Sequence, residues 1–240
     1  MTPIHIDQLI RTNRKTIALV VTRDGRLVVR APLRISMALI EGFVRQKATW
    51  ISEKQYQARQ NAHQSIPHSF TAGESFLYLG RAYSLVISSH TQPLLTLELA
   101  PALASSPAAG GRPASFVLAA SAKPRASQVF IRWYHAQALV VLGERIAHYA
   151  ALTGLVPSGL RITSARTRWG SCSSRGTLSF PWRLVMAPLA AIDYVVVHEL
   201  VHITEKNHAR PFWQGVARIM PDYARQVAWL KTNGHLLTLG

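Results

Sequence analysis

Two histidines and a glutamate stand close together in the segment His198-Glu199-Leu200-Val201-His202. Residues four apart on a helix project from the same face, so His198 and His202 can bind a single cation. A hydrolytic zinc site needs three protein ligands and one open position, and His208 follows ten residues after His198. We therefore predict one zinc ion per chain, held by His198, His202 and His208, with other divalent metals as alternatives.

Glu199 is predicted to act as a general base and not as a metal ligand. Its carboxylate would accept a proton from the water that the metal acidifies and pass it to the leaving group. Apolar residues 194–197 and Ile203 flank the motif, and buried imidazoles and carboxylates are costly there unless they are paired or bind a cation. The structural alternative is two core histidines bonded to the backbone beside a surface glutamate. Asn207 is the residue best suited to a left-handed turn before His208.

The segments around the motif show strand and helix patterns. Residues 16–21 and 27–30 are β-branched runs on either side of Asp24-Gly25, which predicts a hairpin. Ser36 precedes a helical pattern that extends into residues 53–64, and residues 127–154 predict a long amphipathic helix that stops at Gly154. Further short strands are predicted at residues 76–79, 83–87, 160–163 and 177–180.

The domain organisation is predicted from a change in composition. Residues 100–114 consist mainly of Ala, Pro, Ser and Gly and cannot bury a core, which predicts a flexible loop. We therefore expect a β-rich N-terminal region with one helix over residues 1–99. A low-complexity linker or insertion would occupy residues 100–122, and a metal-dependent hydrolase domain residues 123–240.

Composition limits the partners and the compartment. The chain has 27 Lys and Arg against 11 Asp and Glu, a net charge of +16, so nucleotides or nucleic acid are alternative partners. The single Cys172 excludes an intramolecular disulfide, and no secretory signal is visible, so a cytoplasmic location is expected. The most apolar stretch, residues 184–203, contains Asp193 and the motif, which predicts a buried helix and no contact with membranes.

Several segments together carry a family resemblance. They are His198-Glu199-Leu200-Val201-His202-Ile203-Thr204-Glu205-Lys206-Asn207-His208 with Ala209-Arg210-Pro211-Phe212-Trp213, Met220-Pro221-Asp222-Tyr223, Arg168-Trp169-Gly170-Ser171-Cys172-Ser173 and Leu178-Ser179-Phe180-Pro181-Trp182-Arg183-Leu184. Weaker matches are Arg14-Lys15-Thr16-Ile17 and the Asp24-Gly25 hairpin. These segments resemble the YgjP-like (WLM/SprT-related) zinc metallopeptidase family. The resemblance implies an α+β fold in which a zincin-like catalytic domain, with an HExxH helix and three histidine ligands, follows a smaller β-rich region. Pro181 stands where the family has Asn, so the local strand geometry is not transferred.

Other residues near the motif are weaker candidates. Arg168 is predicted to bind an anionic group of the substrate, and a packed turn is the alternative. Tyr223 is a candidate donor to the oxyanion of the transition state, or else an ordinary surface tyrosine. Cys172 is interpreted as a structural thiol, because three histidines already suffice as ligands. Strand 177–180 would either pair with an extended substrate or only complete the sheet.

The sequence is compatible with three functions. Peptide-bond hydrolysis by a metal-activated water, with Glu199 as base, is the first. The second is hydrolysis of phosphoanhydrides or phosphoesters of nucleotides, as by a pyrophosphatase, on the same site. The net charge favours it, as do Arg161, Arg166, Arg168, Arg175 and Arg183. The third is a basic nucleic-acid-associated module with structural zinc, in which Glu199 has no role and the fourth metal position is closed.

Overall fold

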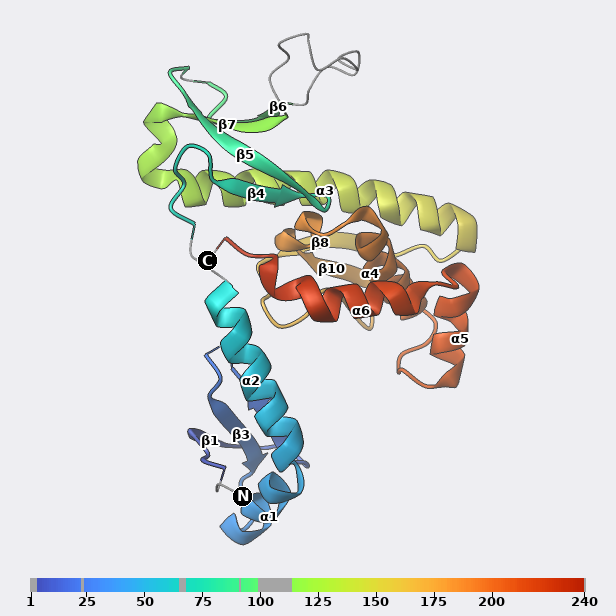
Figure 1. The fold of residues 1–240 in the computed structure, drawn as a ribbon. Helices are drawn as coiled ribbons and strands as arrows, with labels where there is room; N and C mark the ends of the chain where they lie inside the picture. Colours follow the sequence, from blue (N-terminus) through green and yellow to red (C-terminus); the bar gives the residue numbers. More distant parts are fainter. Residues whose placement is uncertain (1–3, 23, 65–67, 91, 99–113, 240) are drawn as a thin grey trace. The chain divides into compact units, whose positions relative to one another are not determined.

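The computed structural model describes residues 4–22, 24–64, 68–90, 92–98 and 114–239 (Figure 1). The chain divides into two compact units, residues 1–67 and residues 68–239. Each unit has its own cluster of buried apolar side chains. They are described separately below.

Unit 1 contains a three-stranded sheet formed by β1 (Gln8–Thr12), β2 (Ala18–Val21) and β3 (Leu27–Pro32). The order is β1-β3-β2, with β3 parallel to β1 and antiparallel to β2. The predicted hairpin is therefore confirmed, and Gly25 supplies the positive φ of 81° that its turn requires. Strand β1 was not predicted.

Two helices cover this sheet where one was expected. Ser36 caps α1 (Met37–Gln46) by accepting a hydrogen bond from the backbone N–H of Leu39 at 3.4 Å. Lys47 leaves the helical conformation, with φ −100° and ψ 15°, and α2 (Ala48–Gln64) begins directly after it. The core combines side chains of β3 with side chains of both helices, namely Leu27, Val29, Ala31, Ile40, Val44 and Ile51.

Unit 2 begins with a four-stranded sheet of order β4-β5-β7-β6. Its strands are β4 (Ser75–Tyr78), β5 (Arg81–Ser88), β6 (Leu95–Glu98) and β7 (Ser115–Ala119). A short 3₁₀ helix, η1 (Ala120–Arg125), follows β7 and leads into the long helix α3 (Ala126–Thr153). Gly154 ends α3 in the left-handed conformation, as predicted.

The rest of unit 2 carries the histidine motif. A second sheet has the order β8-β10-β9, from β8 (Gly159–Thr163), β10 (Thr177–Pro181) and β9 (Ser171–Cys172). The 3₁₀ helix η2 (Trp182–Met186) and the helices α4 (Leu189–Val201), α5 (Arg210–Ile219) and α6 (Tyr223–Asn233) follow, and η3 (Gly234–Leu236) comes last.

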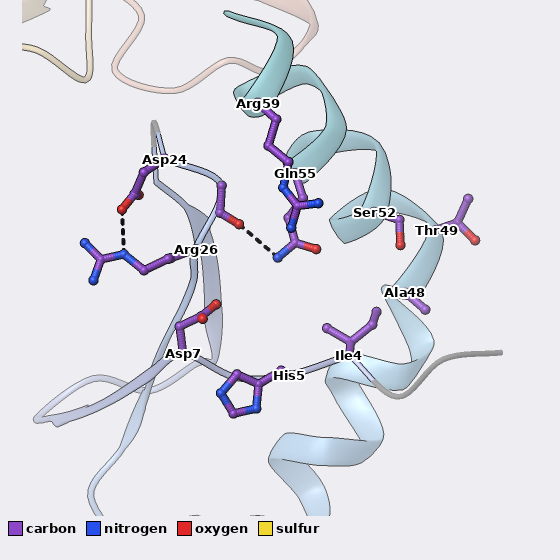
Figure 2. A pocket seen from close by; sticks show the side chains of 11 residues that line it. Ile4, His5, Asp7, Asp24, Arg26, Ala48, Thr49, Ser52, Gln55 and Arg59 are labelled. Atoms are coloured by element: carbon purple, nitrogen blue, oxygen red, sulfur yellow. Dashed lines mark hydrogen bonds and ion pairs between the residues drawn. The ribbon is translucent and has the colours of Figure 1, made fainter. Parts of the chain in front are cut away.

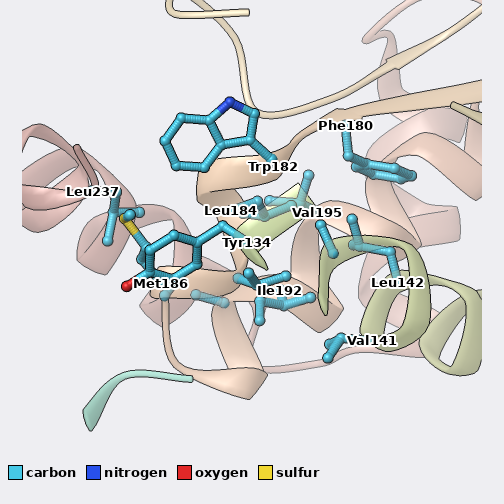
Figure 3. Close-up of a cluster of buried hydrophobic side chains, with 14 of the residues drawn as sticks. Tyr134, Val141, Leu142, Phe180, Trp182, Leu184, Met186, Ile192, Val195 and Leu237 are labelled. Carbon is cyan, nitrogen blue, oxygen red and sulfur yellow. The ribbon is translucent and has the colours of Figure 1, made fainter. Parts of the chain in front are cut away.

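Helix α3 is the centre of the core of unit 2. One end of its buried face packs on the four-stranded sheet, where the Phe130 ring stacks on the Phe76 ring at 4.3 Å. Further along the helix, Tyr134, Val141 and Leu142 meet side chains of β10, η2 and α4 (Figure 3). The two ends of this buried face therefore connect the first sheet to the helix that carries the motif.

The division between the units differs from the boundary predicted near residue 100. Residues 68–98 belong to unit 2 because Phe76, Tyr83 and Leu85 are buried in the same cluster as α3. The turn between β4 and β5 also packs on the start of α4: a Cβ at Gly80 would lie 2.8 Å from Pro188 Cα. Of the predicted linker, residues 115–122 form β7 and part of η1, and residues 100–113 lie outside the described residues.

The fold is a mixed α+β arrangement. Within the described ranges, none of the helices has both the length and the apolar character that a membrane crossing requires.

Candidate metal centre and active site

Helix α4 positions the first residues of the motif. Pro188 precedes the helix, and nearly every side chain from Ala191 to Val201 is buried, so packing on all sides fixes the helix in place. His198, in the last turn, is half-buried, and His202 forms the C-cap with its backbone N–H bonded to His198 O. The end of α4 therefore presents both imidazoles at the edge of a rigid core.

The three predicted ligands converge. Their ligand atoms all lie within 4.8 Å of one another, and they form the group of this kind found among the described residues. His208 Nε2 is 3.0 Å from His198 Nε2 and 3.2 Å from His202 Nε2. Nitrogens on a tetrahedral zinc ion stand roughly 3.3 Å apart, given Zn–N bonds of about 2.0–2.1 Å. The donor set and its spacing fit such an ion.

The outer ring nitrogens are held by the protein. His202 Nδ1 lies 2.8 Å from Glu205 O, and His198 Nδ1 lies 3.3 Å from the Tyr194 hydroxyl. Donation from Nδ1–H to these oxygens leaves the Nε2 lone pairs directed at the common centre. Burial, and then the neighbouring His202 and His208, lower the pKa of His198 to about 4. This imidazole is therefore neutral and available as a ligand at neutral pH.

The chain reverses between α4 and His208, but not through a left-handed Asn207. Apart from glycines, the residues with positive φ in the described ranges are Phe70 and Leu79. Asn207 acts through its side chain instead, because its Oδ1 accepts a hydrogen bond from Ala209 N at 3.0 Å. Lys206 Nζ donates to His202 O at 2.9 Å and so satisfies a carbonyl at the end of α4.

Glu199 is buried, with 5% of its surface exposed. Burial raises the pKa of this carboxyl to about 7, and the opposing effect of the Arg168 charge is smaller. The backbone of Gly170 lies against the carboxyl side chain, since a Cβ at that position would be 2.6 Å from Glu199 Cγ. The segment before β9 therefore covers the carboxylate and requires glycine at residue 170.

Arg183 fixes the start of that covering segment and was not recognised as a positioning residue from the sequence. Its Nη1 donates to Ser164 O at 3.2 Å and to Ala165 O at 2.6 Å. Its guanidinium lies over the Trp182 ring, 4.6 Å from the ring centroid. This arginine is buried and occupied by these contacts, so it does not line a surface for phosphate.

The other candidate residues, Arg168, Tyr223 and Cys172, lie in different surroundings. Arg168 is exposed, and it is close enough to lower the pKa of Glu199. The Tyr223 ring stacks on Trp213 at 5.6 Å and on Tyr194 at 6.3 Å, which connects it to the surroundings of His198. Cys172 is half-buried and is not part of the metal-binding group found among the described residues.

Helix α5 adds aromatic side chains that were not predicted to belong to the site. The Phe212 ring centroid lies 4.8, 4.4 and 4.7 Å from those of His198, His202 and His208. Trp213 lies beside His208, with 5.8 Å between ring centroids. The signal for them was the strongly amphipathic pattern of residues 210–219, which follows the third histidine directly. These rings form an apolar wall around the imidazoles.

The strand predicted to pair with a substrate is in the wrong position for that role. Strand β10 pairs with β8 on one side and, through Leu178 and Ser179, with β9 on the other. It completes the sheet, which was the second interpretation offered for residues 177–180. The edge strand on the side of α4 is β9.

Unit 1 has a separate cavity of about 720 Å³ between its hairpin turn and α2 (Figure 2). Polar groups in its wall pair with one another. Arg26 Nε bonds Asp24 Oδ2 at 2.6 Å, and Gln55 Nε2 donates to Gly25 O at 2.9 Å. Within the described ranges no group of three metal-ligating residues lies in this unit, so the histidine cluster is the stronger candidate site.

Comparison with known protein families gives a match over most of the chain. The family model described as "YgjP-like, metallopeptidase domain" matches residues 15–233. No significant match to a curated protein was found. One solved structure with a partial likeness is the crystal structure of the metallopeptidase zymogen of Pyrococcus abyssi abylysin. The likeness covers 38% of this chain and 93% of that chain, at 18% identity and a TM-score of 0.36. Because the family model spans most of the sequence, the chain belongs to the YgjP-like family of metallopeptidase domains.

Proposed function

We propose that this chain is a zinc-dependent peptidase in which His198, His202 and His208 hold the metal and Glu199 is the general base. The observation that carries the proposal is the convergence of three imidazole Nε2 atoms beside a buried glutamate of the same helix. Family membership supports a metal-dependent peptidase in general. The three histidines and Glu199 are the residues that we propose to carry out this activity.

A bound zinc ion would supply Lewis acidity toward a water and a substrate carbonyl. Glu199 follows His198 directly and precedes His202 by three residues, so its carboxylate belongs to the same helix end. It accepts the proton of the attacking water and returns it to the leaving amine. Gly170 and the start of β9 hold this carboxylate away from bulk water. Phe212 excludes water from the opposite side of the imidazoles.

Two further side chains are proposed to contact the substrate. Arg168 is exposed on the segment that covers Glu199, and its charge suits a carboxylate of the substrate. Tyr223 is half-buried and belongs to the aromatic stack that reaches His198 through Tyr194. A phenol at this place is a suitable donor to a developing oxyanion.

The phosphohydrolase alternative has less support. Of the five arginines that favoured it, Arg183 is buried and bonded to backbone carbonyls. A structural zinc site with no reaction would give the buried carboxyl of Glu199 no role beside the three histidines. Peptide hydrolysis uses the three histidines as metal ligands and Glu199 as base, and we therefore prefer it.

The experiment is a comparison of substrate classes. Zinc-loaded protein is incubated with casein, with nucleoside triphosphates and with single-stranded DNA, and the same assays are run after removal of the metal with a chelator. We expect cleavage of casein alone, lost with the metal and restored by zinc. Phosphate release without peptide cleavage would support a nucleotide phosphohydrolase instead. Metal-independent binding of DNA alone would support a nucleic-acid-associated module with structural zinc.

A further inference from the structure

An open cavity of about 440 Å³ lies along α6 beside the histidine cluster. It is lined by Trp213 of α5 and by residues of one face of α6, which are Tyr223, Ala224, Val227, Ala228 and Lys231. Residues 223, 227 and 231 are four apart, so they form a stripe along the helix. We call this cavity the α6 groove.

The α6 groove adjoins the candidate active site at Trp213. Trp213 lines the groove, and its ring lies 5.8 Å from the His208 ring and 6.0 Å from the His198 ring. Tyr223 stacks on Trp213 inside the groove and on Tyr194, the partner of His198, outside it. Trp213 and Tyr223 therefore belong both to the groove and to the surroundings of the imidazoles.

The lining defines the chemistry of the occupant. Trp213, Tyr223 and Val227 are half-buried and offer an apolar surface, while Ala224 and Ala228 are too small to fill the space between them. Lys231 supplies a positive charge at the far end of the stripe, and it forms no salt bridge within the described ranges. An apolar side chain followed by an acidic one fits both features.

The distance between Val227 and Lys231 determines which two residues of a peptide could contact them. Val227 and Lys231 are one helical turn apart, about 6 Å along the axis. Alternate residues of an extended peptide point to the same side and are about 7 Å apart. A peptide with an apolar residue and an acidic residue two positions away would therefore contact both ends of the groove.

We propose that the α6 groove is a substrate subsite that binds an extended peptide through an apolar side chain on Trp213, Tyr223 and Val227 and an acidic side chain at Lys231. This assignment rests on the proposed peptidase function, which it deepens by naming the class of substrate. Trp213, Val227, Ala228 and Lys231 would thus determine specificity.

Binding is measured first, so that the test does not depend on turnover. Fluorescence anisotropy compares zinc-loaded Glu199→Gln protein with labelled peptides that differ only in a Leu-Ala-Glu, Ser-Ala-Glu or Leu-Ala-Lys segment. We expect the first to bind about tenfold more tightly than the serine peptide. It should bind about fivefold more tightly than the lysine peptide, since an exposed charge pair contributes modestly. Equal affinities, or no detectable binding of any peptide, would overturn the proposal.

Substitutions in the α6 groove then test whether the peptide preferences arise there. Ala228→Phe fills the groove and should abolish the preference for leucine, and Lys231→Glu should reverse the preference from glutamate to lysine. Matched controls are Ala136→Phe on the exposed face of α3 and Arg225→Glu on α6 outside the groove lining. Both should keep the preferences of the parent protein. Circular dichroism confirms that each variant is folded.

The same peptides are finally offered to the wild type and to the two groove variants with Glu199 intact. Cleavage with unchanged selectivity in Ala228→Phe and Lys231→Glu would refute the groove assignment and leave the peptidase assignment in place. Binding with the expected preferences but no cleavage by the wild type would refute the peptidase assignment, and the groove would remain a peptide-binding site.

Discussion

At the scale of single residues, the site depends on a glycine as much as on its histidines. Gly170 lies against the Glu199 side chain, and a Cβ there would approach Glu199 Cγ to 2.6 Å, closer than non-bonded carbons tolerate. The contact is with a carboxylate that is itself buried, so neither group has free space into which to move. The position of Glu199, the proposed general base, is therefore set by the backbone of the neighbouring segment.

Gly170→Ala should consequently impair catalysis without removing the metal. We expect kcat to fall by roughly tenfold to a hundredfold, because displacement of a catalytic group by about 1 Å has effects of this size. The measurement is kcat on a peptide substrate together with zinc content. Gly143→Ala is the matched control, since a Cβ at Gly143 has no neighbour within 4 Å. Full activity in Gly170→Ala would show that the close approach has no functional role.

Loss of one histidine should remove the metal. In His202→Ala only two imidazoles of the cluster remain, and two ligands do not hold zinc at micromolar concentrations against a chelator. We expect about one zinc per chain in the wild type and well under a tenth of that in the variant, by elemental analysis after dialysis. His135→Ala, an exposed histidine of α3, should retain the wild-type content. Equal zinc in both variants would exclude His202 as a ligand.

The sequence predicted which histidines meet because helical spacing alone brings His198 and His202 to one face. It did not reveal Gly170 or Arg183 as supports, since their contacts join segments that are distant along the chain. Arg183 illustrates the difficulty: it was counted among basic residues near the motif, whereas its guanidinium is buried on Trp182 and bonded to Ser164 and Ala165.

At the scale of elements, α3 holds α4 by packing and by one ion pair. Arg145 Nε contacts Asp193 Oδ1 at 2.5 Å, and Nη2 contacts Oδ2 at 3.0 Å, in a bidentate arrangement. The Asp193 hydrogen bonds raise the pKa of Arg145. Asp193 is five residues before His198, so the pair anchors the helix that carries the site.

Arg145→Met should destabilise unit 2, because Asp193 would stay buried without its partner. We expect a loss of about 2 kcal/mol in the free energy of unfolding, less than for a fully buried pair because Arg145 is partly exposed. Urea unfolding measures it. The double variant Arg145→Met with Asp193→Leu should recover part of the loss. No difference between the single variant and the wild type would mean that the pair contributes nothing.

Elements with a regular pattern were predictable and the others were not. The hairpin β2–β3 has turn residues between β-branched runs, and α3 has a long apolar periodicity with a terminal Gly154. Strand β7 is buried on both faces, so it has no alternation, and it directly follows the low-complexity segment. Strand β9 has only two residues, too few for any period to be visible.

At the scale of the whole molecule, the chain combines two units within one family match. The match spans residues 15–233 and so includes most of both units. Their apolar clusters share no residue, and all three proposed zinc ligands belong to unit 2. The composition predicted a boundary near residue 100 because it could not reveal that β4, β5 and β6 pack on α3.

A protein consisting of residues 68–240 should therefore fold and bind zinc without unit 1. The expected result is a cooperative thermal transition by circular dichroism and about one zinc per chain by elemental analysis. A fragment of residues 100–240, which lacks β4, β5 and β6, should not fold, because the aromatic core on α3 would lose the residues that cover it. If the shorter fragment folds and the longer one does not, the division between the units is wrong.

The role of Glu199 as general base can be tested by the rate of peptide cleavage in Glu199→Gln, with the zinc content measured in the same sample. The substitution preserves size and removes the ability to accept a proton. We predict unchanged zinc, at about one ion per chain, and a fall in kcat of at least a hundredfold, within the range expected for loss of a general base. Cleavage at the wild-type rate by zinc-loaded Glu199→Gln protein would contradict the account.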